Sequence, residues 1–222
     1  MTTFLTSVGI VAIAVVLIVA GGGLYLYFKL RRFLRDLAGS ALGPETIHLE
    51  PDQGAWEHAG DLDAAGAFFA SRGFEPVGAF LVPEMPGVRV AGYIMPGDGA
   101  IAVACEHPAA GFWADFVEKY PDDTSITVTS ASRGHELDHR PGHDKVYLKG
   151  VDVAALHDRF LAERRPKAPV VVTAGEFVRV FEQAYADEIA WRKDRGVTAG
   201  EVARVAVEMQ AEDASRSQTA GG

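Results

Sequence analysis

The residues with the most specific chemistry in this sequence are His135-Glu-Leu-Asp-His139. They match the pattern H-E-x-x-H, in which two histidines one helical turn apart bind zinc and the glutamate serves as general base. Gly142 stands where the longer metzincin pattern has its glycine. The third metzincin ligand would fall at Lys145, however, and His143 comes two residues too early. The match therefore depends on whether the first two histidines lie on a helix.

The surroundings of the motif favour a loop instead of a helix. Ser132-Arg-Gly134 comes directly before it, Pro141 and Gly142 follow it, and neither flank supplies the apolar turns that would bury a helix. We expect a polar loop over residues 132–145 and favour no metal site. A weaker alternative is a divalent cation held by some of the loop's imidazole and carboxylate groups. The candidates for that alternative are His135, His139, His143, Asp138 and Asp144.

The sequence assigns no catalytic residue and no cofactor. It contains no P-loop, no G-x-G-x-x-G and no G-x-S-x-G motif. Cys105 is the single cysteine, which excludes an internal disulfide and any site built from several thiolates. Alternation places Cys105 on one strand face with Ile101 and Val103, and small alanines on the other. We therefore expect Cys105 to be a core residue.

Residues 61–210 have the pattern of one α+β domain. Asp61 and Asp152 are predicted N-caps, and Thr173 and Thr198 each begin a capping box with the glutamate three residues later. The predicted strands are 74–82, 88–95, 100–107, 124–130 and a short 146–148. The predicted helices are 62–72, 111–120, 153–164, one that the capping box at 173–176 opens and that runs to about 195, and 202–210. The pattern predicts an antiparallel sheet of about four strands, with helices on one face and a C-terminal helical hairpin.

An apolar segment precedes this domain. Phe4 to Phe28 is a run of 25 residues without a charge. As a helix it would measure about 37 Å, more than the roughly 30 Å hydrocarbon core of a bilayer. The alternative, a cleaved signal peptide, requires a basic leading region and a shorter apolar stretch, and this sequence has neither. We expect residues 1–28 to form a single-pass transmembrane signal-anchor.

The flanks of the apolar segment predict its orientation. Only Met1-Thr-Thr3 precedes it, whereas basic residues follow it directly. The positive-inside rule then places the N-terminus outside and the C-terminal domain in the cytoplasm. Residues 29–42 have the spacing of a basic amphipathic helix at the lipid surface. The expected membrane-interface residues are Tyr25, Tyr27, Lys29, Arg31, Arg32 and Arg35.

Charge separates the two parts of the chain and restricts the partners. Residues 1–42 carry four basic residues and one acidic residue, whereas the remainder carries 17 basic and 29 acidic residues. Such an acidic domain is repelled by nucleic acid, so no nucleic-acid role is expected. The expected partners are the lipid bilayer and a protein at the membrane. Residues 43–60 are expected to be a linker or lead-in, and residues 211–222 a disordered tail.

Two functional hypotheses follow. The favoured one is a non-catalytic binding or scaffold domain tethered to the membrane in the cytoplasm. The alternative is a membrane-anchored, metal-dependent enzyme that uses the polar His/Asp loop 132–145. The two differ in a structural consequence. Histidines that converge within ligand distance would favour the enzyme, whereas histidines that point apart would favour the binding domain.

Overall fold

The computed structural model describes residues 43–108, 110–132, 134–135 and 137–196, and the single positions 198, 200, 201, 204 and 207. The predicted anchor 1–28, the basic helix 29–42 and the tail 211–222 lie outside the described residues, as does most of the predicted helix 202–210. In the part of the chain that is described, no helix combines the length and apolarity needed to cross a bilayer.

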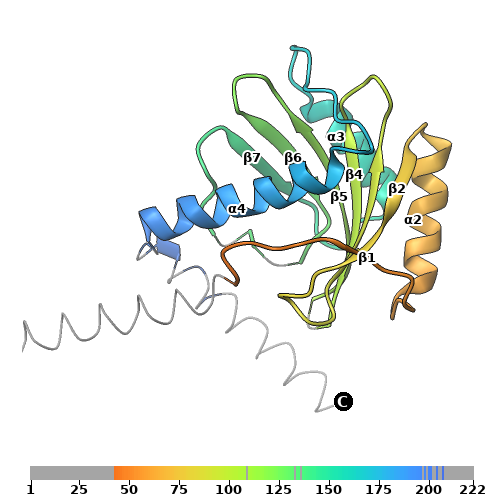
Figure 1. The fold of residues 1–222 in the computed structure, drawn as a ribbon. Coiled ribbons are helices and arrows are strands. Elements are labelled where there is room, and N and C mark those ends of the chain that lie inside the picture. The colour runs from red at the N-terminus through yellow and green to blue at the C-terminus, as the bar shows by residue number, and fades with distance from the viewer. Residues whose placement is uncertain are drawn as a thin grey trace, which may run out of the picture. The chain divides into compact units, whose positions relative to one another are not determined.

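A seven-stranded mixed sheet forms the centre of the domain (Figure 1). The strands lie in the sheet in their order along the chain. Each pairs antiparallel with the next except β6 and β7, which are parallel. The strands are β1 (Glu50–Pro51), β2 (Glu75–Leu81), β3 (Arg89–Ile94), β4 (Ile101–His107), β5 (Gly111–Lys119), β6 (Ser125–Thr129) and β7 (His143–Tyr147).

The predicted sheet of about four antiparallel strands is therefore wrong in strand number and in direction. The largest error is the segment 111–120, which was expected to be a helix and instead supplies strand β5. Its apolar residues lie on both faces of the strand, with Phe112 and Phe116 on one and Trp113 and Val117 on the other. A strand covered on both faces loses the simple alternation that identifies an exposed one, so its apolar spacing imitates a helix.

The helices cover both faces of the sheet, which corrects the expectation that they cover one. Helices α2 (Ala59–Ser71) and α3 (Val153–Glu163) pack on one face, and α4 (Phe177–Arg195) crosses the other (Figure 1). The reason is visible in β4, which is buried along nearly its whole length. A strand that is apolar on both faces must be covered on both.

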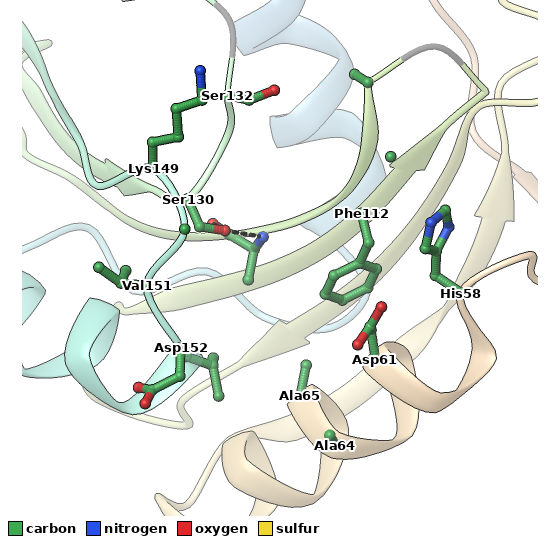
Figure 2. Close-up of a pocket in the computed structure, with 15 residues that line it drawn as sticks. His58, Asp61, Ala64, Ala65, Phe112, Ser130, Ser132, Lys149, Val151 and Asp152 are labelled. Atoms are coloured by element: carbon green, nitrogen blue, oxygen red, sulfur yellow. Dashed lines mark hydrogen bonds between the residues drawn. The ribbon is translucent and has the colours of Figure 1, made fainter. Parts of the chain in front are cut away.

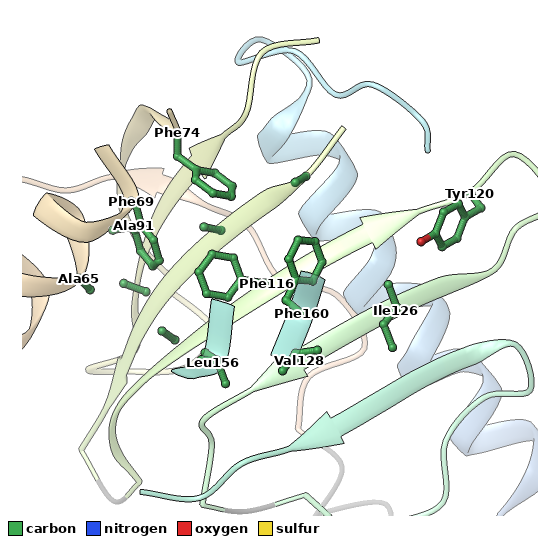
Figure 3. Close-up of a cluster of buried hydrophobic side chains, with 14 residues drawn as sticks. Ala65, Phe69, Phe74, Ala91, Phe116, Tyr120, Ile126, Val128, Leu156 and Phe160 are labelled. Carbon is green, nitrogen blue, oxygen red and sulfur yellow. The ribbon is translucent and has the colours of Figure 1, made fainter. Parts of the chain in front are cut away.

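The core under α2 and α3 combines small residues of the sheet with large aromatic rings (Figure 3). Ala102 and Ala104 of β4 are fully buried, and their small side chains leave room for the rings of Phe69, Phe116 and Phe160. The Phe116 ring centroid lies 5.4 Å from that of Phe69 and 5.5 Å from that of Phe160. The small residues on this face of β4 therefore let α2 and α3 pack close to the sheet.

The core under α4 depends on close approach between the helix and strand β3. A Cβ atom added at Gly92 would lie 2.3 Å from Cζ of Phe177, so only glycine admits the first ring of α4 here. Cys105 is buried in this core with Ile101 and Val103, as predicted. Ile47 and Leu49 are buried here too, so the segment 43–60, expected to be a linker or lead-in, contributes to the packed domain.

Local sequence signals set most of the helix ends. Asp152 caps α3 as predicted, and its carboxylate accepts a hydrogen bond from the Ala155 N–H at 2.8 Å. Glu176 accepts hydrogen bonds from the N–H and the hydroxyl of Thr173, which forms part of the first capping box. At α2, His58 occupies the N-cap position and the helix begins at Ala59, so Asp61 lies in its first turn and is not the cap.

Candidate functional site

The histidines of the H-E-x-x-H pattern lie on no helix in the described part of the loop, and they do not converge. His135 and His139 both contact Tyr147, with ring centroids 6.0 and 5.7 Å away. His143 points elsewhere, with its Nδ1 2.9 Å from the Ser125 hydroxyl. Within the described residues, no group of three His, Cys, Asp or Glu side chains is placed to hold a metal ion.

Asp138, the fourth metal candidate, has a carboxylate that pairs with arginines of the chain itself. Its carboxylate accepts a hydrogen bond from Arg195 at 2.6 Å and also pairs with Arg204. The Asp138 N–H donates to Glu201, the buried glutamate of the second capping box. Because Glu201 also bonds reciprocally with Thr198, these contacts fasten the loop to the end of the domain. The role that the structure gives to Asp138 is structural.

A pocket of about 640 Å³ opens on the face of the sheet that carries α2 and α3 (Figure 2). It lies between the first turns of α2, the start of β5, the end of β6 and the turn that leads into α3. Its apolar lining includes Ala64, Ala65, Ala114, Phe112 and Val153, of which Ala65 and Ala114 are buried and Ala64 is exposed. Its polar groups come from His58, Asp61, Ser130, Ser132, Lys149 and Asp152.

Three of the segments that build this pocket are placed there for local reasons. Alternation along β5 directs Phe112 and Ala114 to the α2 side. The first turn of α2 places Asp61 at the opening, and the cap that begins α3 places Asp152 there. Gly150, with a φ of 74°, turns the chain between Lys149 and this cap in a conformation that other residues rarely adopt.

A buried ionic network supports the α2 end of the pocket. Glu106 is 2% exposed and accepts a hydrogen bond from the His58 N–H at 3.0 Å. Arg89 lies between two carboxylates, 2.7 Å from Asp52 and 3.1 Å from Glu106. Burial by itself would raise the pKa of Glu106, but the hydrogen bonds from His58, Glu57 and Arg89 outweigh it and lower that pKa. Glu106 is therefore a carboxylate at neutral pH.

The same network orients the imidazole of His58. Its Nδ1 lies 3.4 Å from Oε2 of Glu106, and a carboxylate can only accept a hydrogen bond. The neutral tautomer that suits this contact has the proton on Nδ1 and the lone pair on Nε2. A Cβ atom added at the pocket-lining Gly111 would lie 4.0 Å from Nε2, so this nitrogen faces the start of β5. In that tautomer the pocket receives a hydrogen-bond acceptor.

A histidine and the carboxylate that holds it are two of the three members of a nucleophilic triad, so the hydroxyl groups of the pocket decide what chemistry is available. The Ser130 hydroxyl accepts from the Ala114 N–H at 2.9 Å and donates to the Ala114 carbonyl at 3.3 Å. In the described part of the chain, neither Ser130 nor Ser132 hydrogen-bonds to His58. The arrangement offers fixed polar contacts and not an activated nucleophile.

A second polar cluster lies on the opposite face of the sheet, beneath the C-terminal half of α4. Asp115 of β5 has a buried Oδ1 without a hydrogen bond, and its Oδ2 accepts from the Trp113 indole at 3.2 Å. Burial raises the pKa of Asp115 to about 6, although Thr129, Trp113 and Lys145 pull it down. Glu188 of α4 lies 3.9 Å from Lys145 of β7, a pair that joins the helix to the sheet. Glu188 also lies 2.8 Å from Arg192 within α4 itself.

Sequence reasoning missed the pocket because its residues carried other interpretations. Asp61 and Asp152 were identified only as helix caps, and His58 stood in the expected linker. Phe112 was placed on a helix that does not form. The sequence did show two N-cap patterns in front of two helices of similar length. It did not show that α2 packs beside α3, and this packing brings the first turns of the two helices to one pocket.

No family model matches this chain, and neither the curated proteins nor the solved structures include one with significant similarity to it.

Proposed function

We propose that the domain is a non-catalytic binding module that takes a small ligand in the pocket between α2, α3 and β5. The observation that carries the proposal is the pocket itself, with its apolar lining and its polar groups. Its volume of about 640 Å³ falls within the range of small-molecule sites. Apolar walls with a few placed polar groups are the usual composition of such sites.

The polar contacts of the pocket are fixed before a ligand arrives, which supports binding. Glu106 holds His58, the backbone of Ala114 holds Ser130, and Asp152 is bonded to its own helix. Side chains that are already ordered lose little conformational entropy when a ligand binds. The alternative of a metal-dependent enzyme on loop 132–145 has less support, because His135, His139 and His143 point to different partners.

The proposal includes the attachment of this module to the membrane through the apolar segment 4–28, with the domain in the cytoplasm. Its support is the sequence alone: 25 uncharged residues followed by four basic residues within the next seven. The acidic charge of the domain complements this arrangement, because it keeps the domain away from anionic head groups. A protein partner at the membrane belongs to the same proposal.

Alanine methyl groups in the pocket make a direct test possible. The full chain, in phosphatidylcholine nanodiscs and labelled at alanine methyls, would be screened by NMR against a library of small fragments. Ligands in the pocket should shift the Ala64, Ala65 and Ala114 signals and leave Ala190 on the exposed side of α4 unchanged. Ala64→Trp should fill the pocket and abolish the Ala65 and Ala114 shifts.

Two results would contradict the proposal. In the first, no fragment in the library shifts the NMR signals of the pocket methyl groups at millimolar concentration. The other is a set of shifts that persists in the Ala64→Trp protein, because this would place the ligands elsewhere. The Ala102 methyl, fully buried in the core, reports whether each variant keeps the native fold.

A further inference from the structure

The two ends of the pocket differ in chemistry (Figure 2). His58, Asp61 and Phe112 lie together at the α2 end, whereas Lys149 and Ser132 lie at the other. The alanines of α2 and β5 form the apolar surface that completes the pocket. A ligand that fills the pocket therefore meets a different kind of group at each end, and its own polarity must match.

The Asp61 carboxylate provides a negative charge at the α2 end. In the described structure no hydrogen bond or ion pair joins it to another described side chain, so both of its oxygens can accept from a ligand. Its place in the first turn of α2 puts it among the groups that line the pocket. Because Asp61 is exposed, water weakens its attraction for a cation, and the neighbouring His58 and Phe112 must add to it.

The other two groups at this end are also electron-rich. In the neutral tautomer whose Nδ1–H is directed to Glu106, His58 presents the lone pair of Nε2. Phe112 presents a ring whose face carries partial negative charge and attracts cations. Asp61, His58 and Phe112 come from a helix turn, a helix cap and a strand, so the convergence of three acceptors is a product of the tertiary fold.

We infer that the ligand of this pocket is a primary alkylammonium compound, with its ammonium group at Asp61, His58 and Phe112 and its short alkyl part over the alanines. This inference rests on the proposed binding function. A primary ammonium group has three N–H donors, which suits the carboxylate and the imidazole lone pair, and its charge suits the ring. A carboxylate or phosphate at this end would face three groups that repel or cannot donate to it.

The other side of the pocket favours a cation less than the α2 end does. Lys149 and Asp152, which carry opposite charges, both line that side, so their effects on an ammonium group oppose each other. Ala64, Ala65 and Ala114 line the pocket as well, and their small side chains leave room for methylene groups. Each methylene removed from water contributes about 0.8 kcal/mol, so affinity should rise with the first few carbons of the chain.

The test compares two probes of nearly equal shape and opposite charge, n-butylammonium and n-butyrate. The full chain in phosphatidylcholine nanodiscs is titrated with each at pH 7, and the Ala64, Ala65 and Ala114 methyl shifts give the dissociation constants. We expect n-butylammonium to bind at least tenfold more tightly than n-butyrate. Asp61→Asn should weaken n-butylammonium about tenfold, as expected for loss of a charged hydrogen-bond partner.

A matched control separates a local contact from general charge. Asp63 lies on the same helix, is exposed, and does not line the pocket, so Asp63→Asn removes the same charge without removing the contact. It should leave the affinity unchanged within about twofold. Phe112→Leu keeps the apolar bulk and removes the ring, and should weaken binding about threefold. The Ala102 methyl again checks the fold.

The outcomes distinguish this inference from the proposed function. Fragment binding that Ala64→Trp abolishes, together with equal or tighter binding of n-butyrate, would overturn the ammonium inference and leave the binding module standing. Equal weakening by Asp61→Asn and Asp63→Asn would overturn it as well, because the effect would then be long-range charge. If neither these probes nor the fragment library occupies the pocket, both proposals fail.

Discussion

Asp115 allows the sharpest test of the electrostatics beneath α4. Burial raises the pKa of its carboxyl from 3.8 to about 6, because the ionised form is poorly solvated there. The stabilising effect of the protonated form is fully present below about pH 4 and is lost as the pH rises through about 6. Above pH 7 the ionised carboxylate then reduces the free energy of unfolding by about 3 kcal/mol, and at pH 4 the effect is small.

Asp115→Asn replaces the carboxyl with a neutral group of the same shape, which can still accept the hydrogen bond from Trp113. The variant should therefore gain stability over the wild type as the pH rises, with a gain at pH 8 that exceeds the gain at pH 4 by about 2 kcal/mol. Urea unfolding of a fragment that begins at Gly43, followed by tryptophan fluorescence at several pH values, measures this difference. The exposed Asp63→Asn is the control and should show no such trend.

A difference between variant and wild type that stays constant from pH 4 to pH 8 would refute this reasoning. It would mean that Lys145, whose charge lowers the pKa of Asp115, compensates fully for the burial. A gain that falls with rising pH would show that the ionised carboxylate stabilises α4 on the sheet. Either result would mean that ionised Asp115 does not reduce the free energy of unfolding, and that its ion pairs offset the cost of burying its charge.

Four further measurements test other parts of the structure. Gly92→Ala should destabilise the Gly43 fragment by about 2 kcal/mol in urea, because its Cβ would overlap Phe177, whereas Gly60→Ala, with open space around it, should not destabilise it. Asp152→Ala should cost about 1 kcal/mol through loss of the α3 cap, and equal stability would show the cap to be dispensable. EDTA should leave the thermal midpoint unchanged, since the loop histidines do not converge. Full-length fusions should give a fluorescent C-terminal reporter and inactive alkaline phosphatase, and the reverse would refute the cytoplasmic placement.

Local interactions explain the features that could be predicted from the sequence. The Asp152 cap and the alternating faces of β4 each depend on residues within a few positions of one another. Backbone groups at helix ends need partners, and side chains of a strand alternate, whatever the rest of the chain does. The core position of Cys105 followed from this alternation alone.

The positions of β5 and α4 depended on the tertiary structure. Residues 111–119 carry apolar side chains for both faces of the sheet, so their spacing fits a helix until neighbouring strands are placed on each side. Similarly, no local feature of the sequence indicates which face of the sheet α4 covers. That is decided by Gly92, which leaves room for Phe177 on the face opposite α2 and α3.

The candidate site shows the same division most clearly. The sequence by itself placed an acidic residue at the start of each of two helices, because a helix N-terminus favours oxygen acceptors and negative charge. Only the packing of α2 beside α3 on β5 brought Asp61, His58, Phe112 and Lys149 around one cavity. The same packing left His135, His139 and His143 apart, although they are close in sequence. A site is a convergence of side chains from distant segments, and long-range burial of the sheet determines that convergence.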